Sequence, residues 1–114
     1  MIYLLKEKAS PEQVKEMLQA LSVYIKLAVD IENKIVAGGG ILHADCEAIL
    51  LEADSLQENI WGADWIPNTQ EVTFESLINI RPRQHNFSME VESQELRDRI
   101  EKIVREIFKS VNDE

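Results

Sequence analysis

The sequence is poor in several kinds of residue, and each shortage excludes a class of protein. Its 114 residues include a single cysteine, Cys46, which excludes an internal disulfide and a cysteine-ligated zinc site. No run approaches the roughly 20 apolar residues that span a membrane, so we expect no transmembrane helix. The first residues lack a basic segment followed by an apolar one, so we expect no signal peptide and a cytoplasmic protein.

Basic residues are scarce as well. The chain has 12 Lys and Arg against 21 Asp and Glu, a formal net charge of −9. Nucleic acids and anionic lipids are bound through clusters of basic side chains, so this composition disfavours both as partners. The 45% hydrophobic and 29% charged residues are typical of a globular protein, and the length predicts one domain over residues 1–114.

Helices are predicted near both ends of the chain. Ser10 suits the N-cap of the first helix, Pro11 its first position, and Gln13 the partner of Ser10 in a capping box. The second helix is predicted from an apolar stripe at helical spacing, which includes Leu96, Ile100, Ile103 and Ile107. Opposite charges four residues apart could pair along it: Asp98 with Lys102, Glu101 with Arg105, and Lys102 with Glu106.

The region between the helices has mainly the pattern of strands. Apolar residues alternate over residues 26–31, and a turn at 32–34 leads to a second strand that runs into Gly38-Gly39-Gly40. Three glycines in a strand predict a bulge, a bend or a close backbone approach. Residues 48–51 fit a strand or a helix, and the turn predicted at 53–55 favours a strand.

Two further strands are predicted at residues 59–66 and 72–80, followed by a loop over residues 83–91. Short connections between successive strands predict an antiparallel meander. The predicted fold is therefore α+β: a two-layer sandwich in which the N-terminal and C-terminal helices pack on one face of the sheet.

The charges are unevenly placed along the chain. No Lys or Arg lies between Lys34 and Arg81, whereas eight acidic residues do, and Arg81, Arg83 and His85 then follow within five residues. The acidic stretch could be a solvated surface. Alternatively, the basic loop could pair with acids of its own chain or of a second copy in a homodimer, or form an anion clamp. The candidate ligand-binding or anion-binding residues are Arg81, Arg83, His85, Asn86 and Trp61.

A second candidate site is the segment His43-Ala44-Asp45-Cys46-Glu47. On a strand, His43, Asp45 and Glu47 would share one face and could ligate a divalent metal or act as acid and base. Local hydrogen bonding of His43 with solvated acids is the alternative. If the segment is a helix, the grouping on one face disappears. No other cofactor is predicted.

Three segments together resemble a known family: Gly38-Gly39-Gly40-Ile41-Leu42-His43-Ala44-Asp45-Cys46-Glu47, Trp61-Gly62-Ala63-Asp64 and Ile78-Asn79-Ile80-Arg81-Pro82. The chain is similar, nearly end to end, to small single-domain prokaryotic proteins catalogued only as a domain of unknown function. The resemblance implies a shared compact fold and brings no activity with it.

No complete catalytic set is present, so the sequence leaves open whether the protein is an enzyme. The first hypothesis is a noncatalytic module that forms a homodimer and binds a small ligand or a protein beside the Arg81–Asn86 loop. The second is a metal-dependent hydrolase that uses His43, Asp45 and Glu47. The third is a regulator that contacts nucleic acid through the Arg81–His85 loop.

Overall fold

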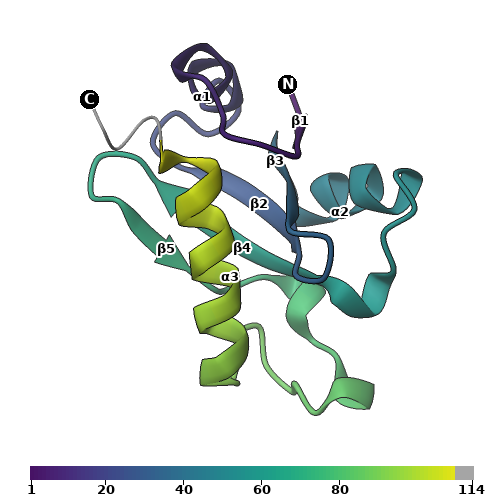
Figure 1. The fold of residues 1–114 in the computed structure, drawn as a ribbon. Coiled ribbons are helices and arrows are strands. Elements are labelled where there is room, and N and C mark those ends of the chain that lie inside the picture. Colours follow the sequence, from purple (N-terminus) through teal and green to yellow (C-terminus); the bar gives the residue numbers. More distant parts are fainter. Residues whose placement is uncertain (110–114) are drawn as a thin grey trace.

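The computed structural model describes residues 1–109 and forms a single sheet covered by helices (Figure 1). Its strands are β1 (Tyr3–Leu5), β2 (Ile25–Asp30), β3 (Ile35–Gly40), β4 (Ile60–Ile66) and β5 (Glu71–Thr73). Its α-helices are α1 (Pro11–Met17), α2 (His43–Glu52) and α3 (Gln94–Ile107). Short 3-10 turns lie at η1 (Gln57–Asn59), η2 (Leu77–Asn79) and η3 (Pro82–Gln84).

The sheet has the order β1-β3-β2-β4-β5, and every neighbouring pair is antiparallel. The predicted α+β class is therefore confirmed. The N-terminal and C-terminal helices, α1 and α3, both contribute to the larger apolar core on one face of the sheet. Within residues 1–109, no helix has the length and apolar character needed to cross a bilayer.

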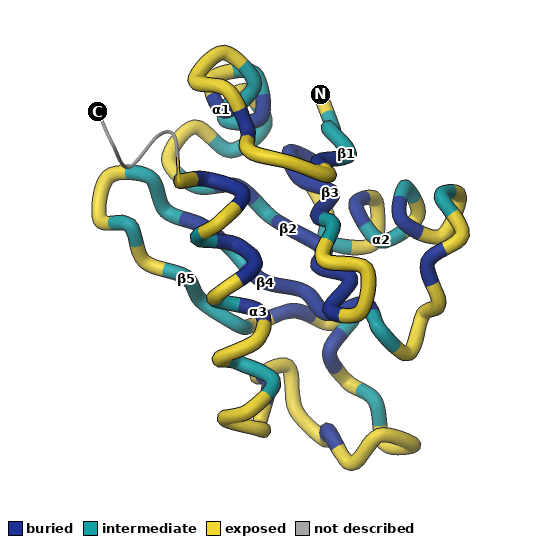
Figure 2. Tube along the Cα trace, viewed as in Figure 1, coloured by how far each residue is buried: buried dark blue, intermediate teal, exposed yellow. Residues whose placement is uncertain are grey.

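The two faces of the sheet bury different side chains, because successive residues of a strand point to opposite sides. In β2, Leu27 and Val29 face the larger core under α1 and α3, whereas Ala28 faces the smaller cluster under α2. Trp65 stacks on Phe108 in the larger core, with ring centroids 4.2 Å apart. Figure 2 shows the three central strands, β2, β3 and β4, as the most deeply buried part of the chain.

Both terminal helices begin as predicted. The Ser10 hydroxyl accepts a hydrogen bond of 3.1 Å from the Gln13 amide, and the Gln13 side chain accepts one of 2.9 Å from the Ser10 amide. This reciprocal pair is a capping box. At the start of α3, the Ser93 hydroxyl accepts from the Leu96 amide at 3.2 Å.

The glycine run makes the predicted bulge. The pairing of β2 with β3 shifts between Lys26 and Leu27, and the unpaired Gly39 has a φ of +106°. A Cβ atom on Gly39 would lie 2.3 Å from the Met1 carbonyl oxygen. Glycine is therefore required here both by the backbone conformation and by the close approach of the N-terminus.

The strand predicted at residues 48–51 is wrong, because residues 43–52 form helix α2. Cys46 and Leu50, four residues apart, are the buried side chains of α2, and they pack on the opposite face of the sheet from α1 and α3. Ala28 and Ala37 lie beneath them in the sheet. Small residues in β2 and β3 thus leave space for a helix that the sequence pattern of α2 alone does not indicate.

The strand predicted over residues 72–80 is also too long, because β5 ends at Thr73. The buried Asn79 side chain replaces it as the partner of β4. Its Oδ1 accepts from the Gly62 amide at 2.7 Å, and its Nδ2 donates to the Gly62 carbonyl at 3.0 Å. The chain therefore leaves the sheet and forms η2, where the Ser76 hydroxyl accepts from the Ile78 amide at 3.2 Å.

Candidate functional site

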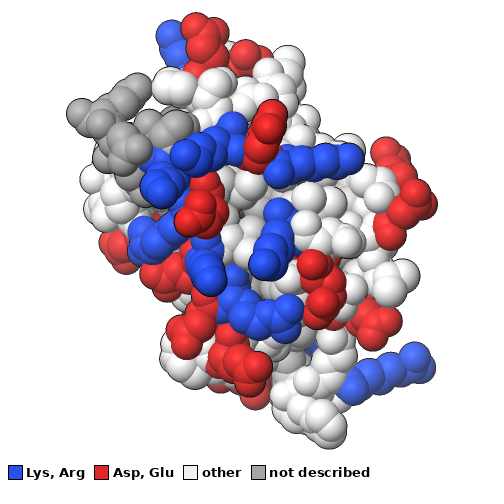
Figure 3. Space-filling view, viewed as in Figure 1, with Lys and Arg blue, Asp and Glu red and all other residues white. Residues whose placement is uncertain are grey.

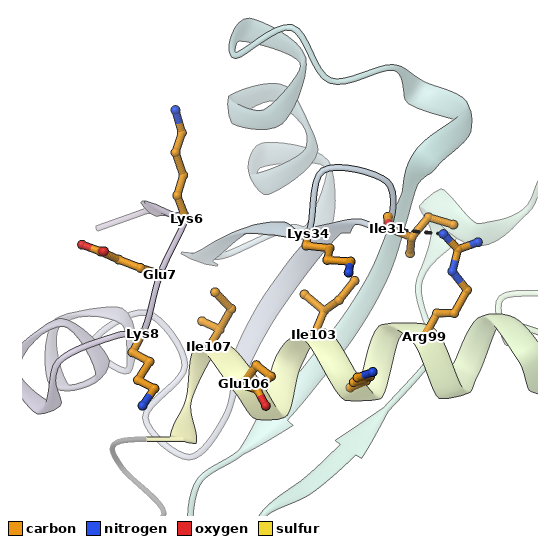
Figure 4. A pocket seen from close by; sticks show the side chains of 10 residues that line it. Lys6, Glu7, Lys8, Ile31, Lys34, Arg99, Ile103, Glu106 and Ile107 are labelled. Atoms are coloured by element: carbon orange, nitrogen blue, oxygen red, sulfur yellow. Dashed lines mark hydrogen bonds between the residues drawn. The ribbon is translucent and has the colours of Figure 1, made fainter.

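A groove of about 640 Å³ lies between three parts of the chain. These are the segment that joins β1 to α1, the turn between β2 and β3, and one side of α3. The residues that line the groove are Lys6, Glu7, Lys8, Ile31, Lys34, Arg99, Lys102, Ile103, Glu106 and Ile107. Figure 4 shows Lys34 pointing from the turn toward Ile103 on α3, while Lys6 and Glu7 extend outward from the rim.

The groove concentrates positive charge in an acidic protein. Five of the 12 Lys and Arg of the chain line it, together with two glutamates. The space-filling view shows many Lys and Arg across the face that carries α3, with Asp and Glu among them and at the edge beside α2 (Figure 3). The local charge therefore has the opposite sign to the net charge of −9.

Most of these cations lack a carboxylate partner. Within residues 1–109, Lys6, Lys8, Lys34 and Lys102 form no ion pair. Of the three pairs predicted along α3, only Glu101 with Arg105 forms, at 2.8 Å. Arg99 contacts the Glu32 carboxylate at 3.1 Å and the Ile31 carbonyl at 3.3 Å. Unpaired ammonium groups of this kind are available to an external anion.

The inner wall of the groove is apolar. Ile103 and Ile107 lie one turn apart on α3, and Ile31 follows the end of β2; all three belong to the larger core. A cationic rim over an apolar wall can bind both parts of an amphiphilic anion, because the rim pairs with the charge and the wall removes the apolar part from water.

The sequence does not predict the groove, because the Lys and Arg that line it are scattered over residues 6–102. The only local indication lies on α3. Arg99 and Lys102 lie four residues and one residue before Ile103, so a helix brings both to the same border of its apolar stripe. Nothing in the sequence indicates that Lys6, Lys8 and Lys34 line the same groove as this helix.

Arg81, predicted as an anion-binding residue, is occupied by the protein itself. Its guanidinium donates to the carbonyls of Ile78 at 2.8 Å, Gln57 at 2.8 Å and Ile60 at 2.7 Å, and to Glu47 at 3.3 Å. Burial lowers the pKa of Arg81, and the charge of Glu47 offsets part of this effect. Arg81 therefore ties the loop to β4 and α2.

Two other candidate anion-binding residues, Asn86 and Trp61, are buried. Asn86 is buried, and its side chain donates to the carbonyls of Asn79, Ser88 and Glu90. Trp61 is 1% exposed, and the Arg81 guanidinium lies 5.2 Å from its ring centre.

Only Arg83 and His85 of the predicted set are exposed. Arg83 borders a hollow of about 620 Å³ on the outer side of the loop, next to Ile80 and Gln57. The predicted site is thus a loop that the hydrogen bonds of Arg81 and Asn86 hold in place, with two exposed basic side chains.

The three predicted metal ligands do not converge, because they lie on a helix. Two residues along an α-helix turn the side chain by about 200°, so Asp45 points away from His43. His43 instead contacts Asp64 at 2.8 Å, and Glu47 contacts Arg81. Among residues 1–109, no group of three or more His, Cys, Asp or Glu is arranged to hold a metal ion.

The comparisons with known proteins identify the family and no activity. A family described as a protein of unknown function, DUF5674, matches residues 3–107. Searches of the curated proteins and of the solved structures each give no match. The match to the family covers α1, α2, α3 and the whole sheet, and the chain therefore belongs to DUF5674.

Proposed function

We propose that the protein is a noncatalytic binding module whose groove takes a small anion with an apolar part. The observation that carries this proposal is that Lys6, Lys8, Lys34, Arg99 and Lys102 all line one groove with an apolar wall, in a chain with a net charge of −9. Five cations against two glutamates give the groove an excess of positive charge, which disfavours the folded chain through like-charge repulsion. A bound anion would relieve this repulsion.

The apolar wall narrows the class of ligand. Inorganic anions gain electrostatic attraction and hydrogen bonds from the rim, and salt screens this attraction at exposed sites. An alkyl or aryl group laid against the exposed parts of Ile103 and Ile107, which are 8% and 5% exposed, adds about 25 cal/mol for each Å² of apolar surface removed from water. We therefore infer a ligand such as an alkyl carboxylate rather than a free inorganic ion.

Three matched probes test the proposal by isothermal titration calorimetry: octanoate, acetate and octylammonium. Octanoate has the charge and the apolar chain, acetate has only the charge, and octylammonium has the chain with the opposite charge. We expect octanoate to bind more tightly than both of the others. Equal binding of octanoate and acetate would contradict the role of the wall, and binding of octylammonium would contradict the role of the charge.

A pair of charge reversals locates the site. Lys102→Glu should weaken octanoate binding about three- to tenfold, which corresponds to roughly 0.7–1.4 kcal/mol. Lys15→Glu makes the same change in net charge at an exposed position of α1 that does not line the groove. We expect no change in this control, and equal weakening in both variants would show that only the net charge matters.

A second proposal, that the module forms a homodimer through the loop at residues 80–87, is supported by a separate observation. Ile80 and Phe87 are 44% and 65% exposed, although buried Asn86 holds the loop in place. Arg83 and His85 lie between these two apolar side chains. A second copy would offer both apolar residues and the acids of α2 as partners.

The two alternative functions have less support. A hydrolase that uses His43, Asp45 and Glu47 depended on their sharing one face, which helix α2 prevents. A nucleic-acid regulator depended on the Arg81–His85 loop, in which Arg81 is bonded to Gln57, Ile60 and Ile78. A short DNA duplex added to the set of probes would support the regulator if it bound more tightly than octanoate at about 0.15 M salt.

A further inference from the structure

His43 and Asp64 form a pair whose geometry fixes the tautomer of the imidazole. The Nε2 atom of His43 lies 2.8 Å from Oδ1 of Asp64 and 3.1 Å from the carbonyl oxygen of Ala63. Both partners are acceptors, so Nε2 must carry a hydrogen and donate it. In the neutral ring, Nδ1 therefore holds the lone pair.

The pair is held from several elements. His43 is the first residue of α2, and its side chain is 10% exposed. Asp64 lies in β4, and its side chain is 14% exposed. The second oxygen of Asp64 accepts a hydrogen bond of 3.2 Å from the Thr73 hydroxyl of β5. A carboxylate with both oxygens bonded keeps the ring in one orientation, as the outer partners of ligating histidines do in other sites.

The other ring nitrogen of His43, Nδ1, is not used by the described part of the protein and is not fully buried. Within residues 1–109, Nδ1 of His43 makes no hydrogen bond, and it is not one of the buried polar atoms that lack a partner. His43 borders a hollow of about 370 Å³, which is separate from the basic groove. His43, whose lone pair at Nδ1 is unused by the described residues, thus lines a space large enough for a small molecule.

The walls of the hollow indicate the class of ligand. Leu42, Leu77 and Met89 give it apolar sides, although all three are among the more exposed apolar residues of the chain. The charged side chains that line it are Lys26, Asp64 and Glu75, one cation against two carboxylates. This balance does not favour an anion, and the apolar sides favour a largely apolar molecule.

We propose that this hollow is a second ligand site, in which His43 accepts a hydrogen bond at Nδ1 from a neutral ligand that carries a hydroxyl group on an apolar body. Phenols and small alcohols have this chemistry. The apolar body would lie against Leu42, Leu77 and Met89, which water now contacts. The site is independent of the groove and of its anion.

Two probes that differ by one hydroxyl group test the site: p-cresol and toluene. Titrations followed by NMR should show p-cresol binding about three- to tenfold more tightly than toluene, the ratio expected for one net hydrogen bond. The His43→Phe variant keeps an aromatic ring and removes the acceptor, so the ratio should fall to about one. His85→Phe, at the other histidine of the chain, should leave the ratio unchanged.

The wild-type protein also gives a result that does not depend on the variant folding. The ¹⁵N shifts of the two ring nitrogens of His43 report which of them is protonated, and we expect hydrogen on Nε2. The addition of p-cresol should shift the Nδ1 resonance of His43 and leave His85 unchanged. A proton on Nδ1 in the neutral ring, equal binding of the two probes, or no binding of p-cresol would each overturn the proposal. Lys102→Glu should not alter p-cresol binding, which separates this site from the groove.

Discussion

The Ser55 hydroxyl donates a hydrogen bond of 2.6 Å to the Asp30 carboxylate, which has no exposed surface at the end of β2. The amides of Glu32 and Asn33 each donate to the same carboxylate at 3.0 Å, and the Asn33 side chain donates at 2.8 Å. These donors fix the turn that carries Lys34 into the groove. A buried carboxylate that lost them would be strongly destabilising.

This cluster predicts a dependence of stability on pH. Burial by itself raises the pKa of Asp30, but the hydrogen bonds from Asn33, Ser55 and Glu32 outweigh it, so the pKa lies below its ordinary value of 3.8. The ionised form is therefore favoured in the folded state. Its contribution to stability is present above pH 3.8 and is lost as the pH falls through the folded value.

Ser55→Ala tests this prediction by urea unfolding at pH 7 and at a series of lower pH values. At pH 7, we expect the free energy of unfolding to fall by about 1–3 kcal/mol, because a buried charge loses a donor. The difference from the wild type should shrink as the pH falls through the folded pKa of Asp30, which lies below 3.8. A loss that kept the same size at every pH at which the protein stays folded would contradict the proposed ionisation of Asp30.

Arg81 and Arg83 should differ strongly in their effect on stability. Arg81→Ala removes three hydrogen bonds to backbone carbonyls and the partner of Glu47, so we expect a loss of about 2–4 kcal/mol in urea unfolding. Arg83 is exposed, and Arg83→Ala should change stability by about 0.5 kcal/mol or less. Similar losses in the two variants would show that Arg81 does not anchor the loop.

Gly62 should tolerate no side chain while Ser76 is present. A Cβ atom on Gly62 would lie 2.5 Å from the Ser76 Cβ atom, where η2 crosses β4. Gly62→Ala should therefore lower the free energy of unfolding by about 1–3 kcal/mol. Adding Ser76→Gly should recover part of the loss, and strictly additive effects in the double variant would rule out this contact as the cause.

Cys46 should be unreactive in the folded protein. Burial raises the pKa of its thiol, and Sγ lies 3.5 Å from the Lys26 carbonyl under α2. A disulfide reagent such as dithiobis(nitrobenzoate) should modify Cys46 slowly at neutral pH and rapidly in denaturing urea, because the thiolate is the reactive form. Rapid modification of the folded chain would mean that α2 opens readily.

The predicted homodimer can be tested by light scattering at several salt concentrations. If Arg83 pairs with acids of a second copy, salt should promote dissociation, and Arg83→Glu should weaken the dimer more than Lys15→Glu does. Both variants change the net charge equally, so their difference isolates the loop. A monomer at high protein concentration and low salt would refute self-association.

The sequence predicts the elements whose pattern is local. Ser10 and Gln13 identify the start of α1, and the stripe from Leu96 to Ile107 identifies α3, because both depend on neighbours in the same helix. The alternation in β2 and the glycines of β3 likewise predict strands and a bulge.

Features that depend on distant residues were predicted wrongly or missed. Helix α2 is recognisable only when Ala28 and Ala37 are known to lie beneath it. The early end of β5 depends on Asn79 reaching back to Gly62, 17 residues away. The groove likewise brings Lys6, Lys34 and Lys102 to one surface from three distant segments, and no spacing along the chain indicates this.

The sheet is bordered by its two shortest strands, β1 and β5, each of three residues. A strand this short exposes few free peptide groups, so it is a poor template for adding a strand from another molecule. The short edge strands therefore disfavour the edge-to-edge pairing of sheets by which copies of a chain form amyloid. Any assembly they form depends on side chains, which leaves it open to control by salt and by single substitutions.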